Sequence, residues 1–428
     1  MSFYEREIAR NERRIKRIEE NPDPTKLRST KLFYALERDF RRNQLDVWQS
    51  GRPFAVGDLS APLLRTMGFE VLDLEMGADR ALDHADEYFE MICSAQYPEH
   101  ACDRTVMCIP MLLTNDIPRP SLVVSASTGC LQVGLSNNAI GHHLGIPVYP
   151  IDVDMEASYD SLRYVARQLR GLIDFIEERF PGMKYDEDRL VAYLKADRQG
   201  FQLYRQIYDL KKRVPCPLSP SDAFRQERVP SYYSDPARII EWLQAYRDEL
   251  YERASSGNTA LKEERLRLMW AVSGPYYGGI FNLLQERGVS LPVFMHGIAT
   301  RTYAVRFDCY GDTEEYGRRL TPLEELARMF NRITWCGLAD RWIEDCLYVC
   351  RDLRIDAIVN FVQWGCSPTV GIGKLLGDAA ERELGIPTLQ LEGRAMFQES
   401  GSIQRIEEML GSFIDVCLAR KQRRDAVG

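Results

Sequence analysis

The sequence predicts an α/β protein with two parallel-sheet domains that are related by an internal repeat and are joined to a helical region. Short apolar segments alternate with helical patterns in residues 51–157 and again in residues 265–428. In both segments a Gly-Cys pair, a helical stretch and the letters LGIP follow one another, with LGIP beginning at Leu144 and at Leu384. Strands that alternate with helices form parallel sheets covered on both faces. We therefore expect two similar domains that face each other across a cleft.

The first domain is predicted at residues 51–157. Its apolar segments have the length and β-branched composition of buried strands, and each is followed by a helical pattern or a loop. The expected strands are FAV from Phe54, FEVLDL from Phe69, SLVVSAS from Ser121 and LGIPVYPIDV from Leu144.

The second domain is predicted at residues 265–428 and repeats this order. Its expected strands are RLMWAV from Arg267, LPVFMH from Leu291, DAIVNFVQWGC from Asp356 and LGIPTLQLEG from Leu384. Thr321 and Glu324 flank Pro322 in the pattern of a capping box, which predicts a helix over LEELARMF.

The remaining residues are predicted to be helical. Residues 1–50 form an N-terminal helical arm in which Asp23 is expected to cap a helix that starts at Pro24. Residues 158–264 carry long charged amphipathic patterns and form a mainly helical region. A proline cluster interrupts it between Pro215 and Pro220.

Composition and charge exclude several classes of function. The net charge of −8 is spread along the chain without a basic stripe, so a nucleic-acid partner is not expected. No run reaches the roughly 18 apolar residues of a membrane span, and the charged start lacks the apolar stretch of a signal peptide. We expect a soluble, cytoplasmic protein that does not bind membranes.

Two of the eleven cysteines stand at positions where α/β sheets bind ligands. Cys130 and Cys366 each follow a predicted strand and precede a helix. The positive end of a helix lowers the pKa of a thiol and favours the thiolate that metals require. Two domains of this kind would bring one thiolate each to a shared site.

Cys102 is a third candidate, because it lies among polar residues in YPEHACDRTVMC, between Cys93 and Cys108. Spacing alone does not identify a metal site, since there is no C-x-x-C pair. From the residues alone, packing in the core is the favoured interpretation of any single cysteine. Cys346 and Cys350 are four residues apart on a predicted helix, a spacing that more often marks buried packing than a metal site. His100 and His296 are further residues expected near the cleft.

The segment GCSPTVGIGK, which begins at Gly365, is similar to a phosphate-binding loop but lacks the required spacing. We reject it as a nucleotide site. No catalytic acid, base or proton donor can be identified from the sequence.

At its cysteines the chain resembles the family of ATP-dependent 2-hydroxyacyl-CoA dehydratases and class I benzoyl-CoA reductases. The resemblance runs from about Thr30 to Cys417. It is carried by PEHACDR around Cys102, RPSLVVSASTGC up to Cys130, RLRLMWAVSGPYY from Arg265, DAIVNFVQWGCSP around Cys366, and ELGIPTLQLEG.

The resemblance implies two flavodoxin-like domains with an added helical part. It also implies one [4Fe–4S] cluster per chain, bound by Cys102, Cys130 and Cys366, with Cys93 as the alternative to the first ligand. Three ligands leave one iron open to a substrate oxygen or a small ligand.

The resemblance further implies an acyl-CoA substrate, a homologous second subunit in a heterodimer or larger assembly, and an ATP-hydrolysing iron–sulfur activator that delivers low-potential electrons. A dehydratase of this kind adds one electron to the thioester, and the resulting ketyl radical anion expels the 2-hydroxyl group. The family's benzoyl-CoA reductases reduce the aromatic ring instead. Some relatives are homodimers with a double-cubane cluster that reduce small molecules.

The chain departs from the family pattern at one position. Where the family commonly has Glu-Gly-Asp after the last strand, this chain has Glu392, Gly393 and Arg394. The change weakens the transfer of substrate specificity. A non-enzymatic α/β protein that binds a small ligand between its domains is the remaining alternative.

Overall fold

The computed structural model describes most of the chain. His100 and His296, named above, lie outside the described residues, as do Gly129 of the first Gly-Cys pair and the cysteines Cys309 and Cys336. The described ranges are 1–57, 59–72, 74, 84–97, 101–128, 130–226, 236–272, 274, 279–295, 314–333, 339–396 and 402–427.

The first half of the chain forms a four-stranded, fully parallel sheet with the order β2-β1-β3-β4. Its strands are β1 (Phe54–Val56), β2 (Glu70–Leu72), β3 (Leu122–Ala126) and β4 (Val148–Ile151). All four coincide with predicted segments; β1 has the predicted length, and the other three are shorter than predicted.

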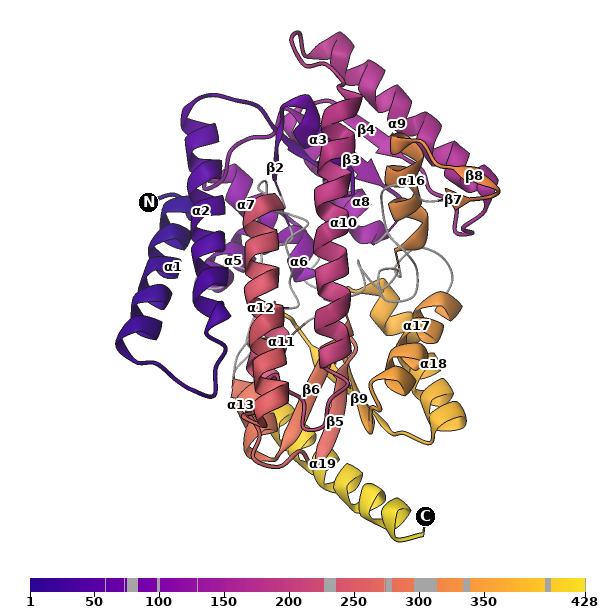
Figure 1. Cartoon of the computed structure of the whole chain (residues 1–428). Helices are drawn as coiled ribbons and strands as arrows, with labels where there is room; N and C mark the ends of the chain where they lie inside the picture. Colours follow the sequence, from indigo (N-terminus) through magenta and orange to yellow (C-terminus); the bar gives the residue numbers. More distant parts are fainter. Residues whose placement is uncertain are drawn as a thin grey trace.

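The second half forms a second parallel sheet with the order β10-β9-β5-β6. Its strands are β5 (Leu266–Trp270), β6 (Val289–Phe294), β9 (Ala357–Gln363) and β10 (Thr388–Gly393). Read from β6, this order matches that of the first sheet strand for strand. The predicted internal repeat is thus confirmed in the topology, and Figure 1 shows the two sheets at opposite ends of the molecule. A short antiparallel pair, β7 (Glu314–Glu315) and β8 (Arg318–Arg319), lies outside both sheets.

Helices cover both faces of the first sheet. In β1, Ala55 belongs to a core shared with α3 (Ala61–Met67) and α9 (Tyr159–Arg179), whereas its neighbours Phe54 and Val56 belong to the core on the other face. This alternation follows from the two-residue period of a strand. The second face is covered by α5 (Ala85–Ser94), α6 (Asp103–Val106), α7 (Cys108–Leu113) and α8 (Leu131–Leu144).

The second sheet has the corresponding helices. Between and after its strands lie α13 (Gly279–Glu286), α17 (Ala339–Asp352), α18 (Ser367–Leu384) and α19 (Ser402–Val427). Helix α13 contacts α19, and α17 contacts α18. Both LGIP segments end a helix with a left-handed glycine, Gly145 at φ 60° and Gly385 at φ 66°, which explains why the repeat retains glycine there.

The helical region joins the two halves. It comprises α1 (Phe3–Glu20), α2 (Ser29–Gln49), α10 (Glu187–Leu210), α11 (Pro220–Gln226) and α12 (Pro236–Ser256). In Figure 1, α10 runs along the molecule from the first sheet toward the second. Leu190 and Leu194 near its start share a core with α9, and Tyr204 and Ile207 near its end belong to the core that contains the second sheet. The predicted cap at Asp23 is wrong, because α2 begins only at Ser29. The Asp23 carboxylate instead accepts hydrogen bonds from the backbone and hydroxyl of Thr25 in a turn.

Helix α16 (Pro322–Arg332) packs with the first sheet rather than the second. Its apolar face, with Leu326 and Phe330, joins the core of α9. The predicted boundary at residue 265 placed this helix in the second domain. An amphipathic pattern shows that one face is buried but does not show against which partner.

The predicted capping box at Thr321 is confirmed, and it leads to a prediction of pH dependence. Arg318 and Thr321 donate hydrogen bonds to the carboxylate of Glu324, and these contacts, that of Arg318 foremost, lower the pKa of Glu324 to about 2. A lowered pKa in the folded state stabilises the protein above the unfolded pKa, and this stabilisation is lost as the pH falls toward the folded value.

We therefore expect Glu324→Gln to lower the free energy of unfolding by roughly 1 kcal/mol at pH 7. The difference from the parent should shrink as the pH falls from 4.5 toward 2. Urea unfolding at a series of pH values measures it, with the exposed Glu263→Gln as the control. A difference that stayed constant down to the lowest pH would contradict the assignment.

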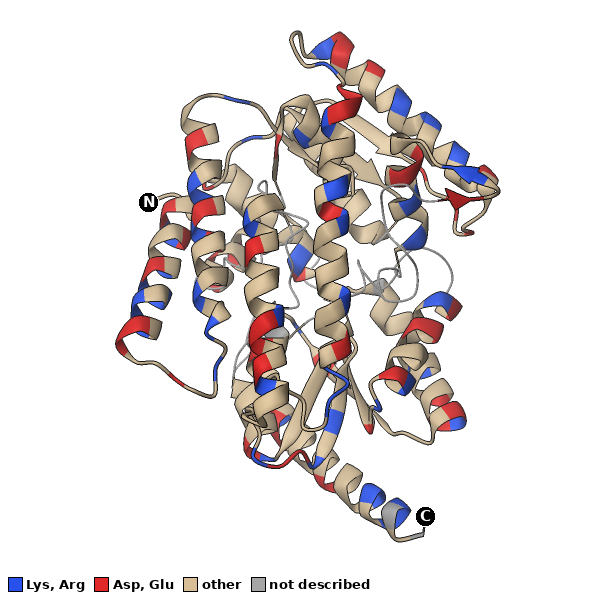
Figure 2. Cartoon of the chain, in the orientation of Figure 1, with Lys and Arg blue, Asp and Glu red and all other residues tan. Residues whose placement is uncertain are grey.

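Charged residues of both signs are mixed along the outer helices, while the strands are largely uncharged (Figure 2). Among the helices that the structure describes, none has the length and hydropathy required to cross a bilayer.

Candidate functional site

The three predicted cysteine ligands share one structural position. Cys102, Cys130 and Cys366 are the N-cap residues of α6, α8 and α18, and all three have extended backbone angles. Each is present as a thiol. Cys102 is buried, and Cys130 and Cys366 are half-buried. The prediction that Cys130 and Cys366 start helices is confirmed, and Cys102 does so as well.

Cys130 and Cys366 occupy equivalent places in the two sheets. Each follows the third strand of its sheet, β3 or β9, whose hydrogen-bonded neighbours include the first strand, β1 or β5. The strand order changes direction between these two strands, and ligands of open α/β sheets bind at this switch point beyond the carboxyl ends. The amino ends of the 14-residue α8 and the 18-residue α18 favour a thiolate at this position.

Helix α8 approaches the first sheet closely, and this fixes the position of Cys130. A Cβ atom at Gly134 would lie 2.7 Å from the carbonyl oxygen of Ala126, so only glycine permits the contact. The hydroxyl of Ser125 on β3 donates a hydrogen bond to the carbonyl of Gly134. The first turn of the helix is thereby attached to the strand that leads to Cys130.

Two of the three cysteines each accept a backbone hydrogen bond from the side chain of a threonine three residues later. These threonines were not predicted from the sequence. The hydroxyl of Thr105 donates to the carbonyl of Cys102 at 2.9 Å, and that of Thr369 donates to the carbonyl of Cys366 at 3.1 Å. The shared pattern, Cys-x-x-Thr, was visible in the sequence as CDRT and CSPT. A hydroxyl bonded to the N-cap carbonyl holds the first turn of the helix below the thiol.

Side chains of the second half contact Cys102 directly. The amide nitrogen of Gln363, the last residue of β9, lies 3.0 Å from the sulfur of Cys102 and 2.8 Å from the carboxylate of Asp103. The other carboxylate oxygen of Asp103 accepts a hydrogen bond from the backbone N–H of Met396 at 2.9 Å. Burial raises the pKa of Asp103, and the N–H of Met396 and the charge of Arg394 oppose this effect.

Arg394, the basic residue at the position where the family pattern is acidic, contacts two aromatic rings. The guanidinium of Arg394 lies over the ring of Phe89 from α5, 4.7 Å from its centre, and over that of Trp364, 5.4 Å from its centre. Its positive charge lowers the pKa of the buried Asp103, against the larger effect of burial, which raises it. The basic residue therefore contacts aromatic rings of both halves and balances a carboxylate next to Cys102.

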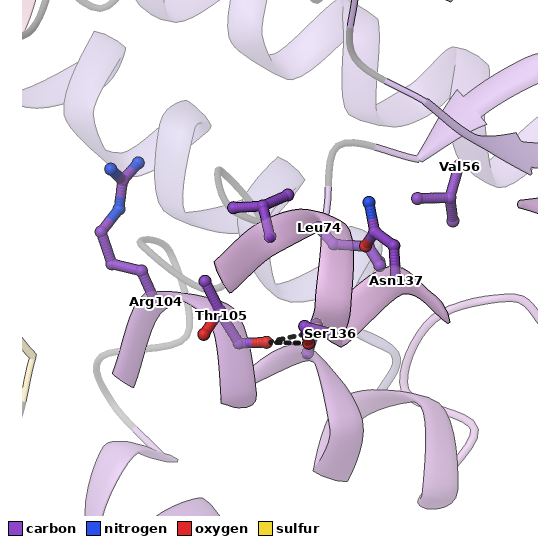
Figure 3. A pocket seen from close by; sticks show the side chains of 8 residues that line it. Val56, Leu74, Arg104, Thr105, Ser136 and Asn137 are labelled. Atoms are coloured by element: carbon purple, nitrogen blue, oxygen red, sulfur yellow. Dashed lines mark hydrogen bonds between the residues drawn. The ribbon is translucent and has the colours of Figure 1, made fainter. Parts of the chain in front are cut away.

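A small cavity of about 10 Å³ lies beside this region, at the carboxyl end of β1 (Figure 3). The hydroxyl of Ser136 on α8 donates to the carbonyl of Thr105 on α6 in its wall. The cavity has room for about one water molecule. Its lining residues are Val56, Leu74, Arg104, Thr105, Cys108, Val133, Ser136 and Asn137.

The other described cysteines differ from these three. Cys346 and Cys350 lie in the core on α17, as expected for packing residues, and burial raises the pKa of both thiols. Burial also raises the pKa of Cys216 to about 11 and that of Cys417 to about 12. A raised pKa disfavours the thiolate. Cys93, the alternative first ligand, is inside α5 and does not share the N-cap position.

Within the described ranges, no three His, Cys, Asp or Glu side chains form a group that could hold a single metal ion. The cysteine ligands of a cubane cluster bind different iron atoms. They therefore stand further apart than the ligands of a single metal ion. The three N-cap thiols are suited in chemistry to such a cluster.

The chain resembles a known family of proteins. A family model described as 2-hydroxyglutaryl-CoA dehydratase, D-component, matches residues 60–416. The chain has no significant match among curated proteins. The matched residues include all three N-cap cysteines and every strand of the two sheets except β1. This chain, with its two sheets of equal topology, therefore belongs to the 2-hydroxyglutaryl-CoA dehydratase D-component family.

Proposed function

We propose that this chain is the iron–sulfur subunit of an ATP-activated dehydratase that acts on a 2-hydroxyacyl-CoA thioester. The observation that carries the proposal is the common N-cap position of Cys102, Cys130 and Cys366. The family match supports the dehydratase class and the acyl-CoA substrate class. The proposal goes further in assigning the cofactor and the radical chemistry.

Cys102, Cys130 and Cys366 would hold one [4Fe–4S] cluster. Their thiol groups are the donor type of such clusters. Helices α8 and α18 direct their positive ends toward two of the ligands, which stabilises the negative charge of thiolates. The two halves supply ligands jointly, because Cys102 and Cys130 belong to the first half and Cys366 to the second.

The bound cluster would supply single electrons at low potential. In the proposed reaction one electron enters the thioester carbonyl, and the ketyl radical anion expels the 2-hydroxyl group as hydroxide. Loss of a proton from the β-carbon and return of the electron would then complete the redox-neutral elimination of water. The protein holds the thiolates in place and shields the site from water with buried side chains, among them Asp103 and Gln363.

The proposed assembly contains further proteins. The family name describes a D-component, which implies a partner component. We propose an ATP-hydrolysing iron–sulfur activator as the electron source and a second homologous subunit beside this chain.

The substrate class is tested by spectroscopy of the anaerobic, cluster-loaded protein. We expect saturating 2-hydroxyacyl-CoA thioesters to change the electron paramagnetic resonance or visible spectrum of the cluster, because three cysteine ligands would leave one iron free to bind a substrate oxygen. Free coenzyme A serves as the control and should change the spectrum less. A spectrum that no thioester alters would remove acyl-CoA as the substrate.

A further inference from the structure

A buried hydrogen-bonded bridge connects the two halves of the chain at Cys102. We define the Asp103 bridge as the hydrogen bonds that link Cys102 and Asp103 to Gln363 and Met396. Gln363 ends β9 and Met396 follows β10, so the bridge joins residues 261 positions apart. Asp103 is 1% exposed, Gln363 2% and Cys102 6%.

The orientation of the Gln363 amide is determined by its partners. The carboxylate of Asp103 only accepts hydrogen bonds, so it requires the nitrogen of the amide rather than its oxygen, and the same nitrogen lies 3.0 Å from the sulfur of Cys102. One N–H therefore points at each partner. The carboxylate of Asp103 is held in turn by the backbone of Met396, which prevents rotation of the group.

From this geometry we infer that Gln363 is a positioning residue that fixes Cys102 against the second half and donates a hydrogen bond to its sulfur. Since Cys102 is a ligand in the proposed function, the inference rests on that proposal and assigns Gln363 the role of raising the electron affinity of the cluster. Gln363 itself touches neither iron nor substrate.

The physical reason is the charge on sulfur. An added electron increases the negative charge of a cluster and of its cysteine ligands, and an N–H donor stabilises this charge. The donor stabilises the reduced form more than the oxidised form. A buried donor has a larger effect than an exposed one, because the surrounding protein screens it less.

The first test is the midpoint potential of the cluster in Gln363→Met, measured by redox titration of the anaerobic protein. Methionine has similar length and no donor. We expect reduction to become about tenfold less favourable, a shift of about 59 mV to more negative potential for one electron. An unchanged potential in a protein with full iron content would overturn the inference.

The matched control is Gln390→Met on the neighbouring strand. Gln390 accepts a hydrogen bond from Asn360 at 2.6 Å and donates one to the carbonyl of Gly373 at 2.9 Å, so its contacts stay within the second half. This variant should lose stability without a shift in potential. An equal shift in both variants would show a general effect of disturbing the sheet and would contradict a specific role of Gln363.

The second test separates the bridge from the cluster. In metal-free protein, Gln363→Met and Asp103→Asn are combined in a double-mutant cycle of urea unfolding. The loss of stability in the double variant should be smaller than the sum of the two single losses, whereas Gln390→Met with Asp103→Asn should be additive. Additive losses in the first pair would overturn the bridge. If the losses of the first pair were not additive but the parent protein bound no iron, the bridge would be supported. Its electronic role would then be contradicted together with the proposed function.

Discussion

Arg267→Met is expected to lower the free energy of unfolding by about 3–5 kcal/mol, because it removes one partner of a buried ion pair. Arg267 on β5 is 3% exposed and lies 2.6 Å from the carboxylate of Glu264. Its guanidinium also donates hydrogen bonds to the carbonyl groups of Lys211, Arg213 and Leu353. Methionine would leave a buried carboxylate uncompensated and three carbonyls without this donor.

Urea unfolding of Arg267→Met, compared with Arg287→Met, measures this effect. Arg287 pairs with Asp415 at 2.8 Å on the surface, and its loss should change stability by less than about 1 kcal/mol. Adding Glu264→Gln to Arg267→Met should restore part of the loss, because the uncompensated charge is then removed. A loss in Arg267→Met no larger than that in Arg287→Met would contradict the buried pair.

The duplicated architecture could be predicted from the sequence because it depends on local signals. The LGIP segments contain the glycines that end α8 and α18 in a left-handed conformation, Gly145 and Gly385. Apolar runs such as AIVNFVQ indicate strands covered on both faces. The equal strand order of the two sheets follows from the same sequence of elements in each half.

The placement of α16 could not be predicted, because it depends on contacts that are distant in the chain. The pattern of Leu323, Leu326 and Phe330 shows an apolar face, and both halves of the molecule offer a core that could accept it. The chain crosses back to the first half between β6 and β9. Local periodicity contains no information about this crossing.

The candidate site could be predicted only in part, because some of its residues follow local signals and others depend on contacts between the two halves. Cys130 and Cys366 follow strands directly, so their place at the sheet edge is visible in the sequence. Cys102 precedes a helix of only four residues, which gives no periodic signal. The contact between Gln363 and Cys102 joins the two halves, and no local pattern predicts it.

The basic residue at Arg394 is explained by its surroundings. Sequence comparison with the family pattern showed only that an acidic position had become basic. The structure places the Arg394 guanidinium over Phe89 and Trp364, where its charge acts on Asp103. Arg394 thus belongs to the surroundings of Cys102.

Changing any one of Cys102, Cys130 and Cys366 to alanine is expected to abolish stable cluster binding. Each thiolate would hold a different iron of the cluster, and the remaining two ligands come from separate helices. Cys346→Ala is the matched control, because Cys346 is buried in the core on α17 and its raised pKa disfavours the thiolate. The control should retain its iron with some loss of stability. Cys93→Ala tests the alternative first ligand and should also retain it.

The most direct measurement is the content of iron and acid-labile sulfide per chain in protein purified without oxygen. The parent, Cys346→Ala and Cys93→Ala should contain about four of each. The three N-cap variants should contain little of either. A parent that stays colourless and free of iron, even after reconstitution with iron and sulfide, would contradict the assignment of Cys102, Cys130 and Cys366 as cluster ligands.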